Sequence, residues 1–208
     1  HDRVTKSYKK ELPSDMNVSD EISFFEYSQH YCICYIDISE STKTTATIKD
    51  PQKIRDYYST FLNSMAAIIS EFHGKIIKSS GDGILYYFPS TSNVESGSAF
   101  SDVLECGLTM ITLRSVIGAK LAGIVPQISY RVSADYGRVE IARSAGNPER
   151  DDLFGSTVNL CTKINSKASP NEMVIGGDLY QVLKNPSFSS LNSKYKFKGT
   201  TEYCLDVR

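Results

Sequence analysis

The sequence predicts one α+β domain in which helices pack on a mainly antiparallel sheet. The main evidence is the order of its periodic segments, which reads β-α-ββ-α-ββ-α-β-α-ββ along the chain. No internal repeat with a period of roughly 20 to 50 residues interrupts this order. The composition agrees, because a chain of 208 residues that is 40% hydrophobic can bury a full core.

The first part of the chain supplies a leader, a strand and a helix. Residues 1–24 are polar and mixed in charge, so we expect a leader or linker before a domain that occupies residues 25–208. The β-branched and aromatic run 31–39 predicts a central strand. Asp50 and Pro51 then provide an N-cap and a first helical residue. The expected buried stripe of this helix consists of Ile54, Tyr58, Phe61, Met65, Ile68 and Phe72.

Two hairpins and a long helix are expected next. Two apolar runs within 75–88 flank a glycine-rich tip, which is typical of a hairpin. Helical periodicity then extends over 94–122. A second hairpin is expected over 128–142 with its turn at Gly137, followed by a polar loop at 144–152.

The last part of the chain predicts a third helix and a closing pair of strands. Ser156 is the expected N-cap of the helix. Its expected buried stripe consists of Val158, Cys161, Ile164 and Ala168. The run 172–177 predicts a strand and 178–183 a short helix, and the segments 194–197 and 202–207 predict the closing pair.

The charge balance excludes one class of partner. The chain has 23 Lys and Arg against 24 Asp and Glu, which gives a net charge of -1. It therefore has no overall basic surface for nucleic acid, and we expect no nucleic-acid partner. Local charges would have to bind any phosphate ligand.

The hydropathy pattern predicts a soluble, cytoplasmic domain. No apolar run approaches the roughly 20 residues that cross a bilayer, and the first residues lack the apolar segment of a signal peptide. The chain begins with His1, so a regulatory domain or membrane segment outside it stays open.

The cysteines indicate a reducing compartment. They number five, an odd count, and lie in apolar periodic segments, as reduced core residues do. Cys32 and Cys34 fall on one face of the predicted strand; a metal or redox site is the alternative for this pair.

Two acidic residues could carry chemistry because of their positions. Asp37 ends an apolar strand, and Asp82 follows Gly81 at a hairpin tip. If their strands are neighbours in the sheet, both carboxylates reach one edge, where they could bind Mg²⁺ or Mn²⁺. The alternative is structural: Asp82 as a turn residue and Asp37 as a cap near a helix.

Several polar residues are uninformative when each is taken alone. Asn159 and Lys163 share a face of the third helix, which is usually a solvated face. Lys78, Arg138 and Lys198 are scattered cations at the edges of strands or hairpins.

Together these residues resemble the class III nucleotidyl cyclase catalytic domain, also called the adenylate and guanylate cyclase homology domain. Four motifs match in the family's order across residues 31–207: YIDISEST, KSSGDGILYYF, DLFGSTVN and FKG. The resemblance implies a ferredoxin-like α+β core that works as a head-to-tail homodimer.

The resemblance also implies a metal site and a catalytic pair. Asp37 and Asp82 match the two metal aspartates, which in the family hold two divalent ions, Mg²⁺ or Mn²⁺, and the main-chain carbonyl of Ile38 would be a further ligand. Asn159 matches the residue that orients the ribose, and Lys163 stands at the position of the transition-state arginine.

The remaining matches concern the substrate. Lys78 and Asp152 fall on the two base-selecting positions, and Arg138 and Lys198 resemble residues that contact phosphates. Adenine presents an acceptor and an amine donor, which a lysine and an aspartate complement. Guanine presents the reverse pattern, and each mismatched buried group costs about 1–3 kcal/mol. This pair therefore predicts ATP.

Departures from the family pattern predict low activity. An ammonium at Lys163 keeps the charge of the family's arginine but cannot make its two-pronged contact with phosphate. Glu40 replaces a glycine in the loop expected around the triphosphate, where its charge would repel phosphate unless it points away. Thr162 stands where small residues are usual.

The leading hypothesis is a homodimeric adenylate cyclase that makes cyclic AMP and pyrophosphate. Asp37 and Asp82 of one subunit would then face Lys78, Asn159 and the other matched residues of the second. The alternative is a degenerate, weakly active cyclase-like module that binds nucleotide and dimerises. A diguanylate cyclase is disfavoured, because Ser-Gly-Asp-Gly-Ile replaces the turn of that group.

Overall fold

A long strand, β1 (Ile22–Ile38), runs through the middle of the sheet in the computed structural model, which describes residues 22–144, 147–199 and 204–207. The other strands are β2 (Lys75–Ser80), β3 (Gly83–Phe88), β4 (Tyr130–Ser144), β5 (Asn147–Phe154), β6 (Met173–Gly176), β7 (Phe197–Gly199) and β8 (Cys204–Val207). The helices are α2 (Ser41–Thr47), α3 (Pro51–Glu71), α4 (Gly97–Thr112), α5 (Arg114–Lys120), α6 (Ser156–Asn165), α7 (Gly177–Leu183) and α8 (Ser189–Lys194), with 3-10 turns η2 (Pro89–Ser92) and η3 (Pro186–Phe188).

The eight strands form one mainly antiparallel sheet. Their order is β2-β3-β1-β4-β6-β8-β7, and β5 pairs with β4 off this path. Only the β4–β6 pair is parallel among the described pairs. The predicted α+β class is confirmed. The predicted leader, 1–24, lies outside the described residues except for the first three residues of β1.

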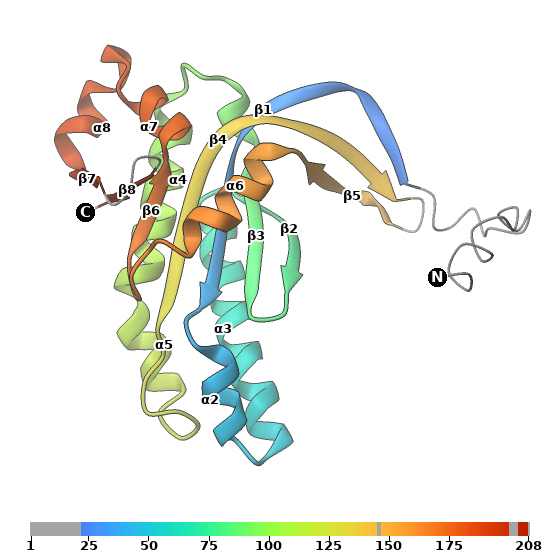
Figure 1. Ribbon diagram of the computed structural model, residues 1–208, viewed down its shortest axis with the longest axis vertical. Helices are drawn as coiled ribbons and strands as arrows, with labels where there is room; N and C mark the ends of the chain where they lie inside the picture. Colours follow the sequence, from blue (N-terminus) through green and yellow to red (C-terminus); the bar gives the residue numbers. More distant parts are fainter. Residues whose placement is uncertain (1–21, 145–146, 200–203, 208) are drawn as a thin grey trace, which may run out of the picture.

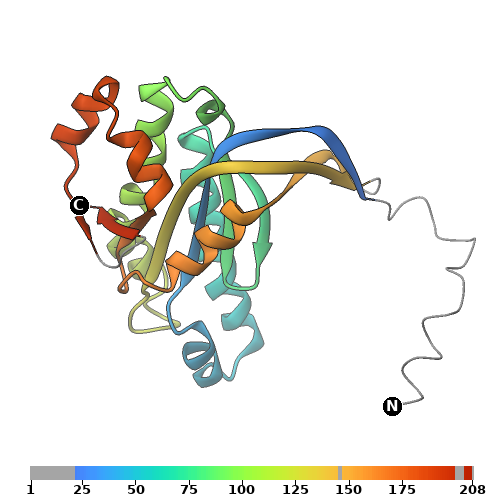
Figure 2. The ribbon, with the colours of Figure 1, turned by 45° about the horizontal axis from the view of Figure 1, so that its top comes forward.

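The sheet separates two apolar clusters, and β1 contributes to both. Its even-numbered residues, such as Cys34 and Ile36, are fully buried in the larger cluster with residues of α3, α4 and α5. Its odd-numbered Ile33 joins a smaller cluster with Leu85 and with Cys161 of α6. Figures 1 and 2 show α6 across one face of the sheet and α3 to α5 on the other. Because side chains alternate along a strand, the odd-numbered side chains near the end of β1 face the side of α6.

Helix α3 begins as the sequence predicts. Asp50 is its N-cap and accepts a hydrogen bond from the backbone N–H of Gln52 at 2.8 Å, and Pro51 is the first residue. The predicted stripe is correct at Phe61 and Met65. At its ends the fully buried residues are Tyr57 and Ile69, each one position away from a predicted residue that is only partly buried.

The predicted helix over 94–122 is two helices. Ser96 caps α4 by accepting from the N–H of Ala99, and Leu113 separates α4 from α5. The chain also forms two short helices that the sequence did not indicate, α2 and α8.

The predicted hairpin turn at Gly137 is wrong. Strand β4 passes straight through Gly137, and the hairpin forms instead between β4 and β5, where a polar loop was expected. A Cβ at position 137 would lie 2.5 Å from the hydroxyl of Thr157. This hydroxyl donates to the carbonyl of Arg138 at 3.0 Å. The glycine is therefore needed for the close approach of α6 to the strand, and not for a turn.

Ser156 is the first residue of α6 and not its cap. The N-cap is Gly155, whose φ of 138° suits a residue without a Cβ, and no side chain caps this helix end. The stripe is confirmed at Cys161 and Ile164, whereas Val158 is partly buried and Ala168 is buried beyond the end of the helix.

The four cysteines whose side chains are described, Cys32, Cys34, Cys106 and Cys161, are buried free thiols, as expected for core residues. Burial raises the pKa of Cys161 to about 12, so its thiol stays protonated. Within the described ranges, no helix is both long enough and apolar enough to cross a membrane.

Asp135 on β4 is a fully buried carboxylate. Its Oδ1 accepts from the N–H of Tyr136 at 2.9 Å and of Leu179 at 3.1 Å, which ties α7 to the sheet. Its Oδ2 has no partner among the described residues. A Cβ at Gly176 would lie 2.2 Å from this carboxyl group, so only glycine fits there. Burial raises the pKa of Asp135 from 3.8 to about 6, against the effect of the two N–H donors.

This pKa makes stability depend on pH. Because the native state binds the proton more tightly than the unfolded state, the contribution of Asp135 is full below pH 3.8 and is lost as the pH rises through about 6, at a cost of about 3 kcal/mol. Asp135→Asn keeps the accepting oxygen and removes the charge. We expect the variant to be about 1–2 kcal/mol more stable at pH 8, with a flatter dependence between pH 3.8 and about 6. Urea unfolding at four pH values measures both; a variant less stable at pH 8 with an unchanged slope would contradict this.

Candidate functional site

The two predicted metal aspartates lie on adjacent strands. Asp37 is in register with Gly83 in the antiparallel β1–β3 pair, so Asp82 is one residue beyond its partner. The backbone N–H of Ile38 donates to the carbonyl of Asp82 at 3.2 Å. The expectation that the strand and the hairpin pair as neighbours is therefore confirmed.

Asp37 is held by an arginine that sequence reasoning missed. Arg131 is its register partner on β4, and its Nη2 lies 2.9 Å from Oδ2 of Asp37. Burial raises the pKa of Asp37, the charge of Asp82 raises it further, and Arg131 opposes both; the net shift is upward. The two carboxylates are thus close enough to interact, and a guanidinium pairs with one of them. No sequence signal marks Arg131, because its role depends on the register.

Asp82 has a different partner. The hydroxyl of Ser41, at the start of α2, donates to Oδ2 of Asp82. Ser41 is nearly buried, with 7% of its surface exposed. Because the partner is a neutral hydroxyl, this bond brings no positive charge to Asp82. Ser41 was also missed, since nothing in the sequence relates the short helix to the hairpin tip.

A cavity of about 490 Å³ brings three predicted site residues together. Asp37, Lys78 and Asn159 line it, from β1, β2 and α6, and Tyr35, Leu85 and Thr162 are also part of its wall. Burial and the carboxylates of Asp37 and Asp82 raise the pKa of Tyr35, so its hydroxyl stays protonated beside them. The wall of the cavity therefore combines a carboxylate, a lysine and an amide.

Lys163 lies in a neighbouring hollow. This space of about 370 Å³ is lined by Asn159, Lys163 and Asp178, with Ser156, Thr157 and Leu160 of α6. Asn159 faces both spaces, so it connects them. Within one chain, Lys163 does not join Asp37 around the cavity.

The structure does not bring Asp152 to Lys78 in one chain. Leu153, its neighbour on β5, packs in the α6-side cluster with Leu85. Alternation then turns Asp152 to the opposite face of β5, where it is paired with Ala142, and its Oδ1 accepts from the N–H of Leu153 at 3.0 Å.

The two predicted phosphate contacts are also apart from the cavity. Arg138 is exposed and makes an ion pair with Glu140, with 3.1 Å between Nη2 and Oε1. Lys198 is on β7, the edge strand at the other end of the sheet from β2. Neither contributes to the cavity wall within one chain.

Glu40 is exposed and pairs with a nearby lysine. It has a left-handed backbone, φ 57°, and is the N-cap of α2. Its carboxylate is exposed and lies 2.5 Å from Nζ of Lys43, which lowers the pKa of Glu40. The left-handed φ explains why a glycine suits this position.

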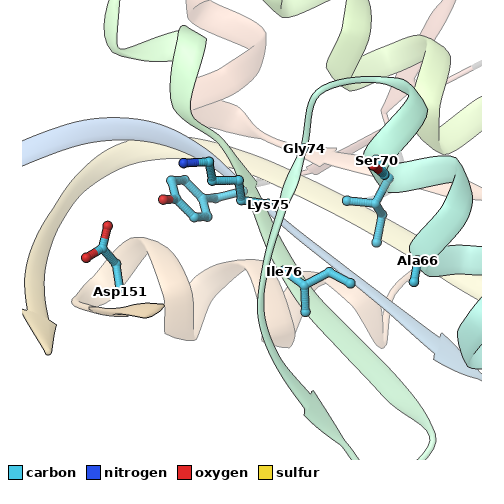
Figure 3. Close-up of a pocket in the computed structure, with 8 residues that line it drawn as sticks. Ala66, Ser70, Gly74, Lys75, Ile76 and Asp151 are labelled. Atoms are coloured by element: carbon cyan, nitrogen blue, oxygen red, sulfur yellow. The ribbon is translucent and has the colours of Figure 1, made fainter. Parts of the chain in front are cut away.

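Another hollow, of about 370 Å³, lies at the edge strand β2 and contains none of the predicted residues. Figure 3 shows Ala66 and Ser70 of α3 on one side of β2, and Lys75 and Asp151 on the other. Asp151 already pairs with Arg143, with 2.6 Å between Oδ1 and Nε. The carboxylate of this hollow is therefore already paired, and Lys75 is the other charged residue that lines it.

The geometry can be compared with known proteins. The family model described as "Adenylate and Guanylate cyclase catalytic domain" matches residues 25–206. The chain belongs to this family. It is therefore a cyclase catalytic domain. The match begins within β1 and ends within β8, so it covers the sheet from its first strand to its last.

Individual relatives agree on the fold and differ in substrate. The domain is similar to the guanylyl cyclase Cya2 (18% identity, TM-score 0.70, 87% of this chain and 92% of that one). It is also similar to the adenylyl cyclase CyaB from P. aeruginosa (19% identity, TM-score 0.69, 90% and 94%). A cytidylate cyclase from Staphylococcus aureus is 23% identical over 164 residues, which are 76% of this chain and 38% of the relative. The chain thus spans well under half of that relative's length.

Glu40 allows a test of the loop at the site. Glu40→Gly removes the left-handed strain, so the cyclase domain should become more stable by about 1 kcal/mol despite losing the exposed ion pair. Glu40→Ala is the matched control, because it loses the same ion pair but keeps a Cβ. Urea unfolding compares the three proteins. Equal stability of the glycine and alanine variants would show that φ at position 40 costs nothing.

Proposed function

We propose that this cyclase domain is an adenylate cyclase, which converts ATP to 3′,5′-cyclic AMP and pyrophosphate in a homodimer with two Mg²⁺ or Mn²⁺ ions per site. The observation that carries the proposal is the cavity that Asp37, Lys78 and Asn159 line together. In the reaction the 3′-oxygen of the ribose bonds to the α-phosphorus, the bond to the β-phosphate breaks, and the 3′-hydroxyl loses its proton.

The donor set fits hard divalent ions. Two carboxylates, Asp37 and Asp82, come from adjacent strands, and Ile38, whose carbonyl would be a third donor, directly follows Asp37. Oxygen donors of this kind suit Mg²⁺ and Mn²⁺. When bound, the ions would lower the pKa of the 3′-hydroxyl and offset the charge of the triphosphate. The raised pKa of Asp37 is consistent with this fit, because a nearby cation relieves the repulsion from Asp82.

The other residues would orient and stabilise the substrate. The amide of Asn159 would hold the ribose, since it faces both the cavity and the adjoining hollow. Lys163, in that hollow, would offset charge that develops on the phosphates, without the fork of a guanidinium. Arg138 and Lys198 would contact phosphate only from a second chain, given their distance from the cavity in one chain.

Lys78 is the residue of the base pocket. Its ammonium would donate to N1 of adenine, which accepts. Asp152 is proposed to accept from the amine, and this needs a change at β5 or the approach of a partner, because the side chain faces away from Lys78 in one chain. Rejection of guanine rests on Lys78, which would meet the N–H donor at N1 of guanine.

A dimer of two equivalent chains would complete the site. Lys163 and Lys198 are separated from Asp37 within one chain, and a second copy could supply them. Exposed apolar side chains offer a surface for it: Leu160 beside Asn159 and, along β1, Ile22, Phe24 and Tyr27. The reduced cysteines agree with a cytoplasmic location, where ATP is available.

The decisive experiment is a substrate panel. The purified chain at high concentration would receive ATP, GTP, CTP or UTP, first with Mn²⁺ and then with Mg²⁺, and products would be identified by mass spectrometry. We expect cyclic AMP, lost in Asp82→Ala and kept in Asp56→Asn, a control on the exposed face of α3. If nucleotide binds but no cyclic product forms with either ion, the degenerate binding module is the better function.

CTP is a second candidate because one relative is a cytidylate cyclase. Cytosine presents an acceptor at N3 next to an amine donor, the same pair of groups as adenine. A lysine with an aspartate therefore fits both bases, and hydrogen bonding alone does not separate them. Cyclic CMP as the main product of the panel would favour this candidate.

Mixing two inactive variants tests the shared site. Asp82→Ala and Lys163→Ala should each have little or no activity, whereas an equal mixture should recover about a quarter of the wild-type activity, because half of the dimers are mixed and each has one intact site. Size-exclusion chromatography with native mass spectrometry confirms that mixed dimers form. No recovery in confirmed mixed dimers would mean that Asp82 and Lys163 act within one chain.

A further inference from the structure

Arg131 engages the carboxylate that the proposed function assigns to metal. Besides the contact of its Nη2 with Oδ2 of Asp37 at 2.9 Å, its Nε lies 3.4 Å from Oδ1. The guanidinium thus reaches both oxygens. About 25% of the Arg131 side chain and 17% of the Asp37 side chain are exposed, so the pair is ordered but open to solvent.

The backbone fixes this pair without any ligand. Asp37 and Arg131 are directly opposite each other in the β1–β4 register, which brings their Cβ atoms within about 5 Å. The side-chain amide of Asn165 on α6 donates to the carbonyls of Tyr35 and Arg131, each at 3.2 Å. One buried amide therefore clamps both strands next to the pair.

A guanidinium and a divalent ion compete for the same lone pairs. Both are cations, and a carboxylate with both oxygens engaged by a fork must release one before a metal ion can bind it. We infer that Arg131 is a built-in competitor of the metal: it holds Asp37 in the metal-free protein and gives up at least one oxygen when an ion binds. The inference rests on the proposed function, because it takes Asp37 as a metal ligand.

The competition affects only one of the two carboxylates. Asp82 is bonded by the neutral hydroxyl of Ser41, which can remain while an ion binds the other oxygen. Arg131 places a positive charge against Asp37, at the expense of metal affinity. Arg131 is thus a positioning residue that sets the metal concentration at which the site is occupied.

The test measures metal binding without nucleotide. Mn²⁺ binding would be followed by the electron paramagnetic resonance signal of the free ion. Arg131→Gln should bind Mn²⁺ about fivefold more tightly than wild type, because the competing ion pair is gone. The same variant should be less stable without metal, and Mn²⁺ should raise its Tm more than that of wild type. A residue with only a structural role would lower stability equally with and without Mn²⁺.

Two matched variants serve as controls. Arg143→Gln removes another arginine–aspartate pair on the same strand, with Asp151, and should leave Mn²⁺ affinity unchanged. Arg131→Lys keeps the charge without the fork, so its affinity should fall between wild type and Arg131→Gln. If Arg131→Gln does not fold, the lysine variant decides.

The outcomes separate the inference from the proposed function. If Asp37→Asn abolishes Mn²⁺ binding but neither Arg131 variant binds more tightly, the competitor role is wrong and the metal site stands. If Asp37→Asn binds Mn²⁺ as wild type does, Asp37 is no metal ligand, and the proposed metal site and the inference both fail.

Discussion

The register of β1 between β3 and β4 is the constraint on which the site depends. Cys34 and Ile36 are fully buried on the side of α3 and α4, and this burial fixes which side chains face α6. A slip of one residue would move Asp37 into the core and Ile36 into the cavity. The aspartate is thus positioned by the packing of its apolar neighbours, and Arg131, the hairpin tip and α6 are all arranged relative to the same strand.

Local charge, and not net charge, gives the site its character. The chain is nearly neutral, yet burial raises the pKa of Asp37, and the nearby charge of Asp82 raises it further. Repulsion between two partly buried carboxylates lowers the stability of the folded state. Such arrangements are common at functional sites. Arg131 offsets part of this cost at Asp37, while the cation of Lys78 lies across the same cavity.

The parts of the site that the sequence could predict are those defined by neighbours along the chain. Asp37 at a strand end and Asp82 at a glycine-rich tip were predicted to meet, and they do. Arg131 was not predictable, because it is 94 residues from Asp37 and only the β1–β4 register relates them. Gly137 was misread as a turn, since a glycine that admits a neighbouring helix looks the same in sequence. Strand β5 was missed for a similar reason: its polar first residues lack the alternation that identifies a strand.

The same physics bears on how selective the base pocket can be. A pocket that hydrogen-bonds one edge of a base rejects the opposite pattern strongly, so Lys78 should discriminate well against guanine. Adenine and cytosine share the acceptor and amine and differ in size, which the walls formed by Tyr35 and Leu85 can sense only by shape. Discrimination by size in an apolar pocket is modest, about 10- to 200-fold per methylene-sized difference. The preference between ATP and CTP should therefore be moderate and not absolute. We expect it to depend more on the space beside Tyr35 than on the placement of Asp152 in the dimer.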